Sequence, residues 1–352
     1  TDMRAAQIVA FQKPLEVGEV PDPTPGPADA VVRVEAEGIC RSDWHAWMGD
    51  WSWVGLSPEL PVIPGHEFSG VVEAVGREVR GIRPGDRVTA PFHEACGHCG
   101  YCLAGVPNLC ETVQIFGITR NGGYARYVLV HNADFNCIKL PESVDFLTAA
   151  AIGCRYMTAY HGVAKQGDVR PGQWVVVHGC GGVGLSAVQI ATAMGAQVIA
   201  VDVSDEKLAK AREEGAVATV NARRESVPEA VRELTRGGAD VSIDALGIRD
   251  TVRNSVLCLR KGGRHVQIGL TTSQEQGEVE LPIDVIVAQE LQIIGSLGNP
   301  HPDYRELLAL VERGTLQPAS LVSQTVRLDE ASDVLQKMTE FGTLGFHIIT
   351  EF

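Results

Sequence analysis

The sequence predicts an α/β chain with two domains, one rich in β-strands and one built on a doubly wound parallel sheet. At 352 residues the chain is too long for one ordinary hydrophobic core. Residues 3–150 hold short apolar runs that Pro and Gly interrupt, which is typical of a β-rich domain with many turns. From Trp174 onward, buried strands alternate with helices, which favours a parallel sheet with helices on its faces.

The individual elements follow from the apolar patterns. The β-rich region has candidate strands at 31–34, 70–75 and 86–88. The second region has candidate helices at 182–194 and 205–214, and six candidate strands at 175–177, 197–201, 218–220, 241–243, 265–268 and 291–294. After Gly295 the pattern becomes irregular again, with helices expected at 304–313 and 328–341 and a last strand at 345–350.

Composition narrows the class of protein. The formal charge of −14 and the absence of clustered cationic residues argue against a nucleic-acid partner. No apolar run reaches eighteen residues and no secretion signal is visible, so we expect a cytoplasmic protein without a membrane span. The nine cysteines are an odd number, and four of them lie between Cys96 and Cys110, which favours metal thiolates over a disulfide framework.

A glycine-rich segment follows the strand at 175–177 and opens the next helix, as in dinucleotide-binding loops. Its residues are Gly179, Gly181, Gly182, Val183 and Gly184. These glycines allow a tight turn, close approach of a pyrophosphate and close helix packing, although a purely structural turn would have the same pattern. Asp202 ends the next strand, where its carboxylate can bind the ribose hydroxyls and repel a 2′-phosphate. The prediction is therefore a site for NAD rather than NADP.

Four cysteines form a compact C-x2-C-x2-C-x7-C pattern: Cys96, Cys99, Cys102 and Cys110. Four thiolates complete the tetrahedral shell of a structural zinc ion and leave no open position for catalysis. An iron–sulfur cluster uses similarly close cysteines, and the spacing alone does not decide between them.

Three further segments carry a family resemblance. They are Gly65-His66-Glu67-Phe68-Ser69-Gly70 with Gly76, Cys40-Arg41-Ser42-Asp43-Trp44-His45, and Cys154 within 149–158. Together with the cysteine and glycine motifs, they resemble the zinc-dependent medium-chain alcohol dehydrogenases over the full chain, and their tetrameric microbial branch in particular. The resemblance implies a GroES-like catalytic domain at 1–155 and 295–352, with the zinc lobe at about 93–112, and a Rossmann domain at 156–294. It also implies a homodimer or homotetramer.

The resemblance assigns roles to individual residues. It implies two zinc ions per chain, a structural one in the cysteine lobe and a catalytic one held by Cys40, His66 and Cys154, with Glu67 as an alternate ligand. Asp43 would orient His66. Hydride would pass between an alcohol and NAD by way of a zinc-bound alkoxide, while Ser42 and His45 relay the proton. Cofactor contacts beyond the glycine loop and Asp202 would come from Arg41, Thr158, Lys207, Ile268, Gly269 and Leu270.

The substrate is expected to be a small alcohol or, in reverse, an aldehyde or ketone. Trp44, Trp47, Phe92 and Leu270 are the candidate pocket residues, and large apolar walls favour a primary or secondary alcohol. Two alternatives stay open. One is a polyol or amino-alcohol dehydrogenase of the same superfamily, and the other is a redox-inactive protein that binds NAD and zinc.

Overall fold

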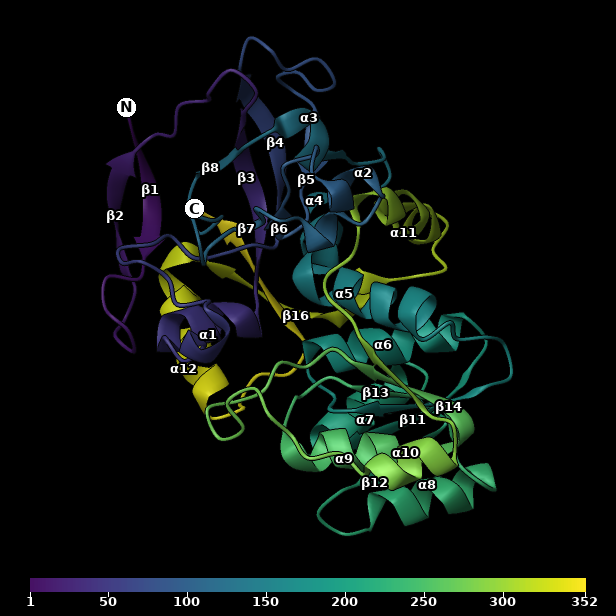
Figure 1. Ribbon diagram of the computed structural model, residues 1–352. Helices are drawn as coiled ribbons and strands as arrows, with labels where there is room; N and C mark the ends of the chain where they lie inside the picture. Colours follow the sequence, from purple (N-terminus) through teal and green to yellow (C-terminus); the bar gives the residue numbers. More distant parts are fainter. The chain divides into compact units, whose positions relative to one another are not determined.

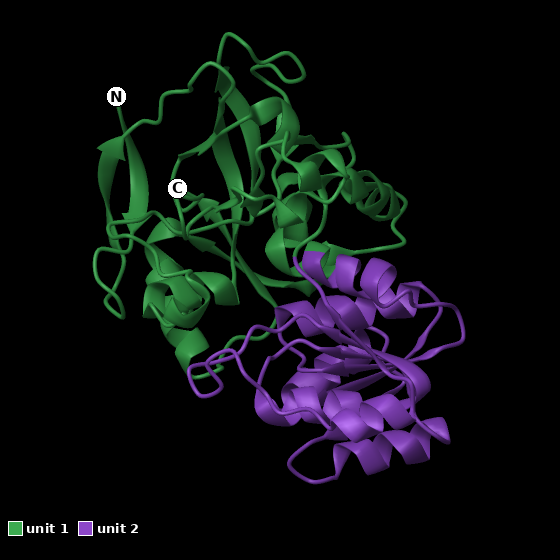
Figure 2. Ribbon diagram, viewed as in Figure 1, with its two compact units in different colours: residues 1–157, 298–352 green, residues 158–297 purple.

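The computed structural model describes all residues from Thr1 to Phe352. The chain divides into two compact units, Thr1–Met157 with Gly298–Phe352, and Thr158–Leu297 (Figure 2). None of the helices combines the length and apolar character needed to cross a membrane.

The second unit contains a six-stranded sheet in the order β12-β11-β10-β13-β14-β15, and every neighbouring pair is parallel. The chain enters in the middle at β10, builds outward to β12, and then crosses over to β13. This confirms the predicted doubly wound sheet. The helices α6 and α8 lie on opposite faces of it (Figure 1). The strands are β10 (Trp174–His178), β11 (Gln197–Asp202), β12 (Ala218–Asn221), β13 (Ala239–Asp244), β14 (Leu259–Gln267) and β15 (Gln292–Gly295), and the helices are α6 (Gly182–Ala193), α7 (Asp205–Glu213), α8 (Val227–Thr235), α9 (Arg249–Leu257) and α10 (Ile283–Ala288).

The first unit is β-rich, as predicted. Its main sheet has the order β16-β17-β3-β4-β5-β9, with β8 paired to β3. These strands are β3 (Ala30–Ile39), β4 (Phe68–Val75), β5 (Arg87–Thr89), β8 (Tyr127–Val130), β9 (Ile138–Lys139), β16 (Val322–Arg327) and β17 (Phe346–Glu351). Two smaller pairs are β1 (Asp2–Gln7) with β2 (Glu16–Pro21), and β6 (His93–Glu94) with β7 (Gln114–Ile115).

The helices of the first unit are short. They are α1 (Arg41–Met48), α2 (Gly100–Leu103), α3 (Ala133–Asn136), α4 (Phe146–Ala151), α5 (Met157–Tyr160, which crosses the unit boundary), α11 (Tyr304–Glu312) and α12 (Ala331–Thr339). The helix expected at 328–341 is α12, preceded by a 3₁₀ turn at Leu328–Glu330. The sequence did not indicate β16, because only Val326 of that strand is buried and the usual alternation is missing.

Candidate metal centres and cofactor site

The structure brings Cys40, His66 and Cys154 together, although they lie far apart in the sequence. Their ligand atoms all lie within 4.8 Å of one another, and the three side chains form a buried group. Two thiolates and one imidazole suit zinc, and three protein ligands leave the fourth tetrahedral position for another molecule. The Nε2 atom of His66 is buried and makes no hydrogen bond to the protein. A metal ion at this position would satisfy it.

Each residue of this group is held at a junction between elements. Cys40 follows β3 as the N-cap of α1, and His66 lies two residues before β4, next to Glu67. Cys154 lies in the π-helical turn Ile152–Tyr156 that follows α4. Within this turn Gly153 has φ 22°, and a Cβ there would lie 2.6 Å from the Glu67 side chain. The turn that carries Cys154 therefore requires glycine.

Asp43 connects two members of the group. Its Oδ1 lies 3.0 Å from Nδ1 of His66 and accepts a hydrogen bond from the Gly65 amide. Its Oδ2 accepts from the Cys40 amide, as an N-cap partner of α1, and from the Tyr124 hydroxyl at 3.1 Å. The carboxylate therefore lies against the His66 imidazole and also accepts a hydrogen bond from the backbone of Cys40. Sequence reasoning missed Tyr124, which belongs to no local motif.

Glu67 does not join the three-residue group. Its Oε1 accepts hydrogen bonds from the Cys154 and Arg155 amides and from Arg155 Nε, and its Oε2 accepts from Arg155 Nη2 at 2.6 Å. With both oxygens occupied, Glu67 is not a zinc ligand in this arrangement. Arg155 is the second residue that sequence reasoning missed, and its only signal was its position beside Cys154.

Burial and close contact perturb the titration of the group. The hydrogen bond from Cys154 and the nearby His66 lower the pKa of the Cys40 thiol well below its usual range, in spite of burial. The contact with Cys40 and burial raise the pKa of Cys154. Burial acts to lower the pKa of His66, but Asp43 and Cys40 raise it well above its usual value. One thiol thus ionises readily, which favours cation binding.

The four cysteines of the lobe also converge. The Sγ atoms of Cys96, Cys99, Cys102 and Cys110 lie within 4.8 Å of one another. The amides of His98 and Cys99 donate to Cys96 Sγ, and the His98 amide contributes most to lowering the Cys96 pKa to about 6. Burial raises the pKa of Cys102 to about 12. No cysteine in the chain forms a disulfide. The lobe has the closed ligand set of a structural zinc site.

The glycine loop lies between β10 and α6, at the point where the strand order of the sheet reverses. Gly179 has φ 91°, and a Cβ on Gly184 would lie 1.6 Å from the Gly179 carbonyl oxygen. A Cβ on Gly181 would meet nothing within 4 Å, so this position leaves open space above the N-terminus of α6. Parallel sheets of this kind bind dinucleotides at this point, with the pyrophosphate at the helix N-terminus.

Asp202 ends β11 with its side chain turned toward this loop. Its Oδ2 accepts a hydrogen bond from the Cys180 amide at 2.8 Å, and its Oδ1 accepts from the Val203 and Ser204 amides. The carboxylate is thereby fixed next to the glycine loop, where a ribose would lie.

The remaining predicted cofactor residues are distributed over both units. In the second unit, Thr158 has a buried hydroxyl without a partner, and Ile268 packs so closely on Gly162 that a Cβ there would lie 2.5 Å away. Gly269 and Leu270 follow β14, and Lys207 lies on α7. In the first unit, the Arg41 guanidinium lies over the rings of Trp44 and Phe341 and donates to the Met338 carbonyl.

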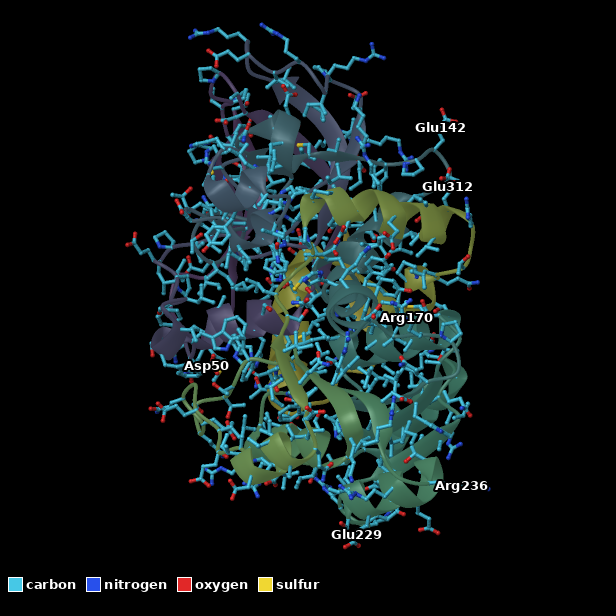
Figure 3. The ribbon with its side chains drawn as sticks, turned by 45° about the vertical axis from the view of Figure 1, so that its right-hand side comes forward. Asp50, Glu142, Arg170, Glu229, Arg236 and Glu312 are labelled. Carbon is cyan, nitrogen blue, oxygen red and sulfur yellow. The ribbon has the colours of Figure 1, made fainter.

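The two predicted relay residues, Ser42 and His45, lie three residues apart on α1. No hydrogen bond joins Ser42 to His45, and His45 Nδ1 instead lies 2.7 Å from Oδ1 of Asp50, which is labelled in Figure 3. The His45 ring stacks on Trp51 at 4.1 Å. Burial lowers the pKa of His45, although Asp50 opposes this effect.

Two tryptophans expected in the substrate pocket belong to the core. Trp44 donates to Thr339 and Trp47 to the Lys13 carbonyl, and both are buried in the hydrophobic cluster around Ile39 and Leu335. Their indole N–H groups therefore already have partners within the core of the first unit. The Phe92 ring lies edge-on to the His66 ring, with the two ring centroids 6.0 Å apart.

The chain is similar in sequence and in fold to known proteins. Residues 26–142 match the alcohol dehydrogenase GroES-like domain, and residues 182–313 match the zinc-binding dehydrogenase domain. An alcohol dehydrogenase of Geobacillus stearothermophilus is 37% identical over 337 residues, which is 96% of each chain. The structure of an alcohol dehydrogenase from Thermus sp. ATN1 superposes with a TM-score of 0.91 at 34% identity, covering 99% of this chain and 100% of that one. A zinc-binding dehydrogenase from Sinorhizobium meliloti, solved with NADP, has a TM-score of 0.87 at 33% identity and covers 99% of both chains. The chain therefore belongs to the zinc-binding alcohol dehydrogenase family.

Proposed function

We propose that the protein is a zinc-dependent, NAD-linked dehydrogenase of primary or secondary alcohols. The buried convergence of Cys40, His66 and Cys154 carries the proposal. A merely structural site would use a fourth protein ligand, as the cysteine lobe does, whereas this group leaves one position for substrate oxygen. Bound zinc supplies a Lewis acid that lowers the pKa of an alcohol hydroxyl.

The residues of the chain prepare this chemistry. Asp43 holds His66 by Nδ1, so that Nε2 stays free for the metal. Phe92 places an apolar ring next to His66, which excludes water and suits an alcohol with an apolar substituent better than a polyol.

The proton of the alcohol leaves through Ser42 and His45 in this proposal. No hydrogen bond joins the two side chains, so a further hydroxyl group, of the kind that a bound dinucleotide would supply, would complete the relay. Asp50 holds His45 Nδ1, which leaves Nε2 as the atom that accepts the proton.

The preferred cofactor is NAD in this proposal, although one structural relative carries NADP. Asp202 supports NAD, because a fixed carboxylate beside the glycine loop repels a 2′-phosphate.

We also propose a homodimer or homotetramer. The outermost strand β15 and helix α10 expose Ile293, Ile283 and Val287, and a second subunit would cover these side chains. Light scattering of the purified protein tests this assembly, which a monomer at micromolar concentration would rule out.

A substrate screen tests the function. Zinc-loaded protein is mixed with NAD or NADP and with primary, secondary and aromatic alcohols, sorbitol or threonine, and reduced cofactor is followed by absorbance. We expect NADH with simple alcohols and about two zinc ions per chain by metal analysis. Turnover of sorbitol or threonine alone would favour a polyol or amino-alcohol dehydrogenase. If no substrate is turned over and only one zinc ion is bound per chain, the protein is instead a redox-inactive protein that binds NAD and zinc.

A further inference from the structure

A continuous chain of buried hydrogen bonds crosses the sheet of the second unit, and the proposed chemistry makes no use of it. It begins at His178, the last residue of β10, whose Nε2 lies 2.9 Å from Ser242 Oγ on β13. Ser242 Oγ lies 2.8 Å from Ser255 Oγ on α9, and Ser255 Oγ lies 2.7 Å from His265 Nδ1 on β14. These four side chains are buried, with exposed fractions of 0% or 1%.

The chain ends at the last residues of β13 and β14. His265 Nε2 lies 2.9 Å from Gln267 Oε1, and the Gln267 amide donates to Asp244 Oδ2 and to the Gly269 carbonyl, both at 2.7 Å. Asp244 also accepts hydrogen bonds from the amides of Leu246 and Gly247. The final bonds therefore reach the two loops that follow β13 and β14.

Donor and acceptor chemistry sets the direction of every bond. The Gly269 carbonyl only accepts, so the Gln267 amide nitrogen faces it and Oε1 faces His265. Burial raises the pKa of Asp244, but this orientation of the Gln267 amide is the same whether Asp244 is charged or neutral. His265 must then donate from Nε2 and accept at Nδ1, which makes Ser255 its donor.

The same reasoning continues back to the start of the chain. Because the Ser255 hydroxyl donates its hydrogen bond to His265, it must accept one from the Ser242 hydroxyl. The Ser242 hydroxyl in turn accepts a hydrogen bond from Nε2–H of His178. Both histidines are thus neutral Nε2–H tautomers. Burial and the neighbouring His265 lower the pKa of His178 to about 3, and burial lowers that of His265. The bare Nδ1 of His178 is buried and has no partner, as this direction requires.

The three strand ends joined by this chain are tightly interlocked. A Cβ on Gly179 would lie 2.5 Å from the Leu246 side chain, and one on Gly247 would lie 2.1 Å from the Leu270 carbonyl oxygen. The Ala245 amide donates to the His178 carbonyl. Such close packing means that a shift of one loop displaces the others.

We propose that the hydrogen-bond chain from His178 to Asp244 is a positioning device for the dinucleotide. It holds the ends of β10, β13 and β14 in the arrangement that binds the cofactor, so the loops need little ordering when NADH arrives. The inference rests on the proposed cofactor binding and adds His178, Ser242, Ser255, His265 and Gln267 to it as positioning residues.

Binding measurements on two variants and a matched control test the proposal. Ser255→Ala removes the middle link, while Gln267→Glu keeps the acceptor for His265 but loses the donor to Asp244 and Gly269. The control Thr89→Val removes a comparably buried hydroxyl in the first unit, which donates only to the Phe68 carbonyl. NADH is titrated calorimetrically into zinc-loaded protein, and thermal melts confirm that each variant is folded.

We expect the Kd for NADH to rise roughly tenfold in both network variants and to stay unchanged in the control. The KM for NAD should rise with it, while the KM for alcohol at saturating NAD stays the same. Folded network variants that bind NADH as tightly as the wild type would overturn the inference and leave the proposed function intact. A wild type that binds no NADH would instead remove the cofactor role from the proposed function, and this inference with it.

Nitrogen NMR of histidine-labelled protein tests the direction of the bonds without cofactor. His178→Asn and His265→Asn identify the two signals. Both histidines should be neutral with the proton on Nε2, and Ser255→Ala should convert His265 into a mixture of tautomers. A proton on Nδ1 of His265 in the wild type would overturn the ordered chain.

Discussion

Arg155 holds the carboxylate of Glu67 from two sides, with Nε 3.0 Å from Oε1 and Nη2 2.6 Å from Oε2. Both side chains are buried, and the Arg155 guanidinium also lies 3.9 Å from the ring of Phe346. Because the Cys154 amide donates to the same carboxylate, the pair fixes the turn that carries this proposed ligand. It also keeps Glu67 outside the proposed metal shell.

Loss of Arg155 should destabilise the protein strongly. Arg155→Met leaves the Glu67 carboxylate buried without a counter-charge, and we expect the free energy of unfolding to fall by about 3–5 kcal/mol. Urea denaturation measures this change. Glu67→Gln combined with Arg155→Met should recover much of the loss, because no unpaired charge remains. Equal stability of Arg155→Met and the wild type would contradict this account of the pair.

Loss of a ligand should have different effects at the two proposed metal sites. Cys154→Ser should abolish alcohol oxidation and lose roughly one zinc per chain while the fold persists, because the cysteine lobe is separate. Cys102→Ser should also lose roughly one zinc, but its main effect should be a lower melting temperature. Metal analysis, activity assays and thermal melts distinguish the two variants. Full activity with two zinc ions in Cys154→Ser would place the third ligand elsewhere.

Asp202 should determine the choice of cofactor. Asp202→Ala would remove the proposed hydrogen bonds to the ribose and the proposed repulsion of a 2′-phosphate, so the KM for NAD should rise about tenfold or more. The ratio of kcat/KM for NAD over NADP should fall, while the KM for alcohol stays constant. Steady-state kinetics with both cofactors measures these values. An unchanged ratio would mean that another residue discriminates between them.

His301 should make the fold sensitive to acid. Burial, with a contribution from His93, lowers the pKa of His301 to about 3, and its Nε2 lies 2.9 Å from Asn136 Oδ1. An unfolded histidine titrates near 6.5, so the unfolded state binds more protons at lower pH. The stability contribution is complete above pH 6.5 and decreases as the pH falls from about 6.5 toward about 3.

The variant His301→Gln keeps a donor for Asn136 but does not titrate. Between pH 6 and 4 its free energy of unfolding should depend less on pH than that of the wild type, by up to about 1.4 kcal/mol per pH unit. Chemical denaturation at several pH values provides the test. Identical slopes would show that His301 is protonated in the native state.

The sequence predicted more of the second unit than of the first. Buried parallel strands appear as continuous apolar runs such as Val175-Val176-Val177. The glycine loop shows where the first of these strands ends and its helix begins. In the first unit, β16 has one buried residue and could not be recognised. The sequence also did not indicate that Trp44 and Trp47 are buried in the core cluster around Ile39 and Leu335. An aromatic side chain shows its chemistry in the sequence but not the direction in which it points.

The sequence by itself determined the fold class, the family and the chemical types of the proposed ligands, because local spacing and residue type carry that information. Only the tertiary structure decided which distant groups meet. It paired Glu67 with Arg155, placed Tyr124 on Asp43, and joined His178 to Asp244 through side chains on β13, α9 and β14. Such contacts arise when strands and helices far apart in the chain pack together, since hydrogen bonds and ion pairs depend on distance in space and not on separation in sequence.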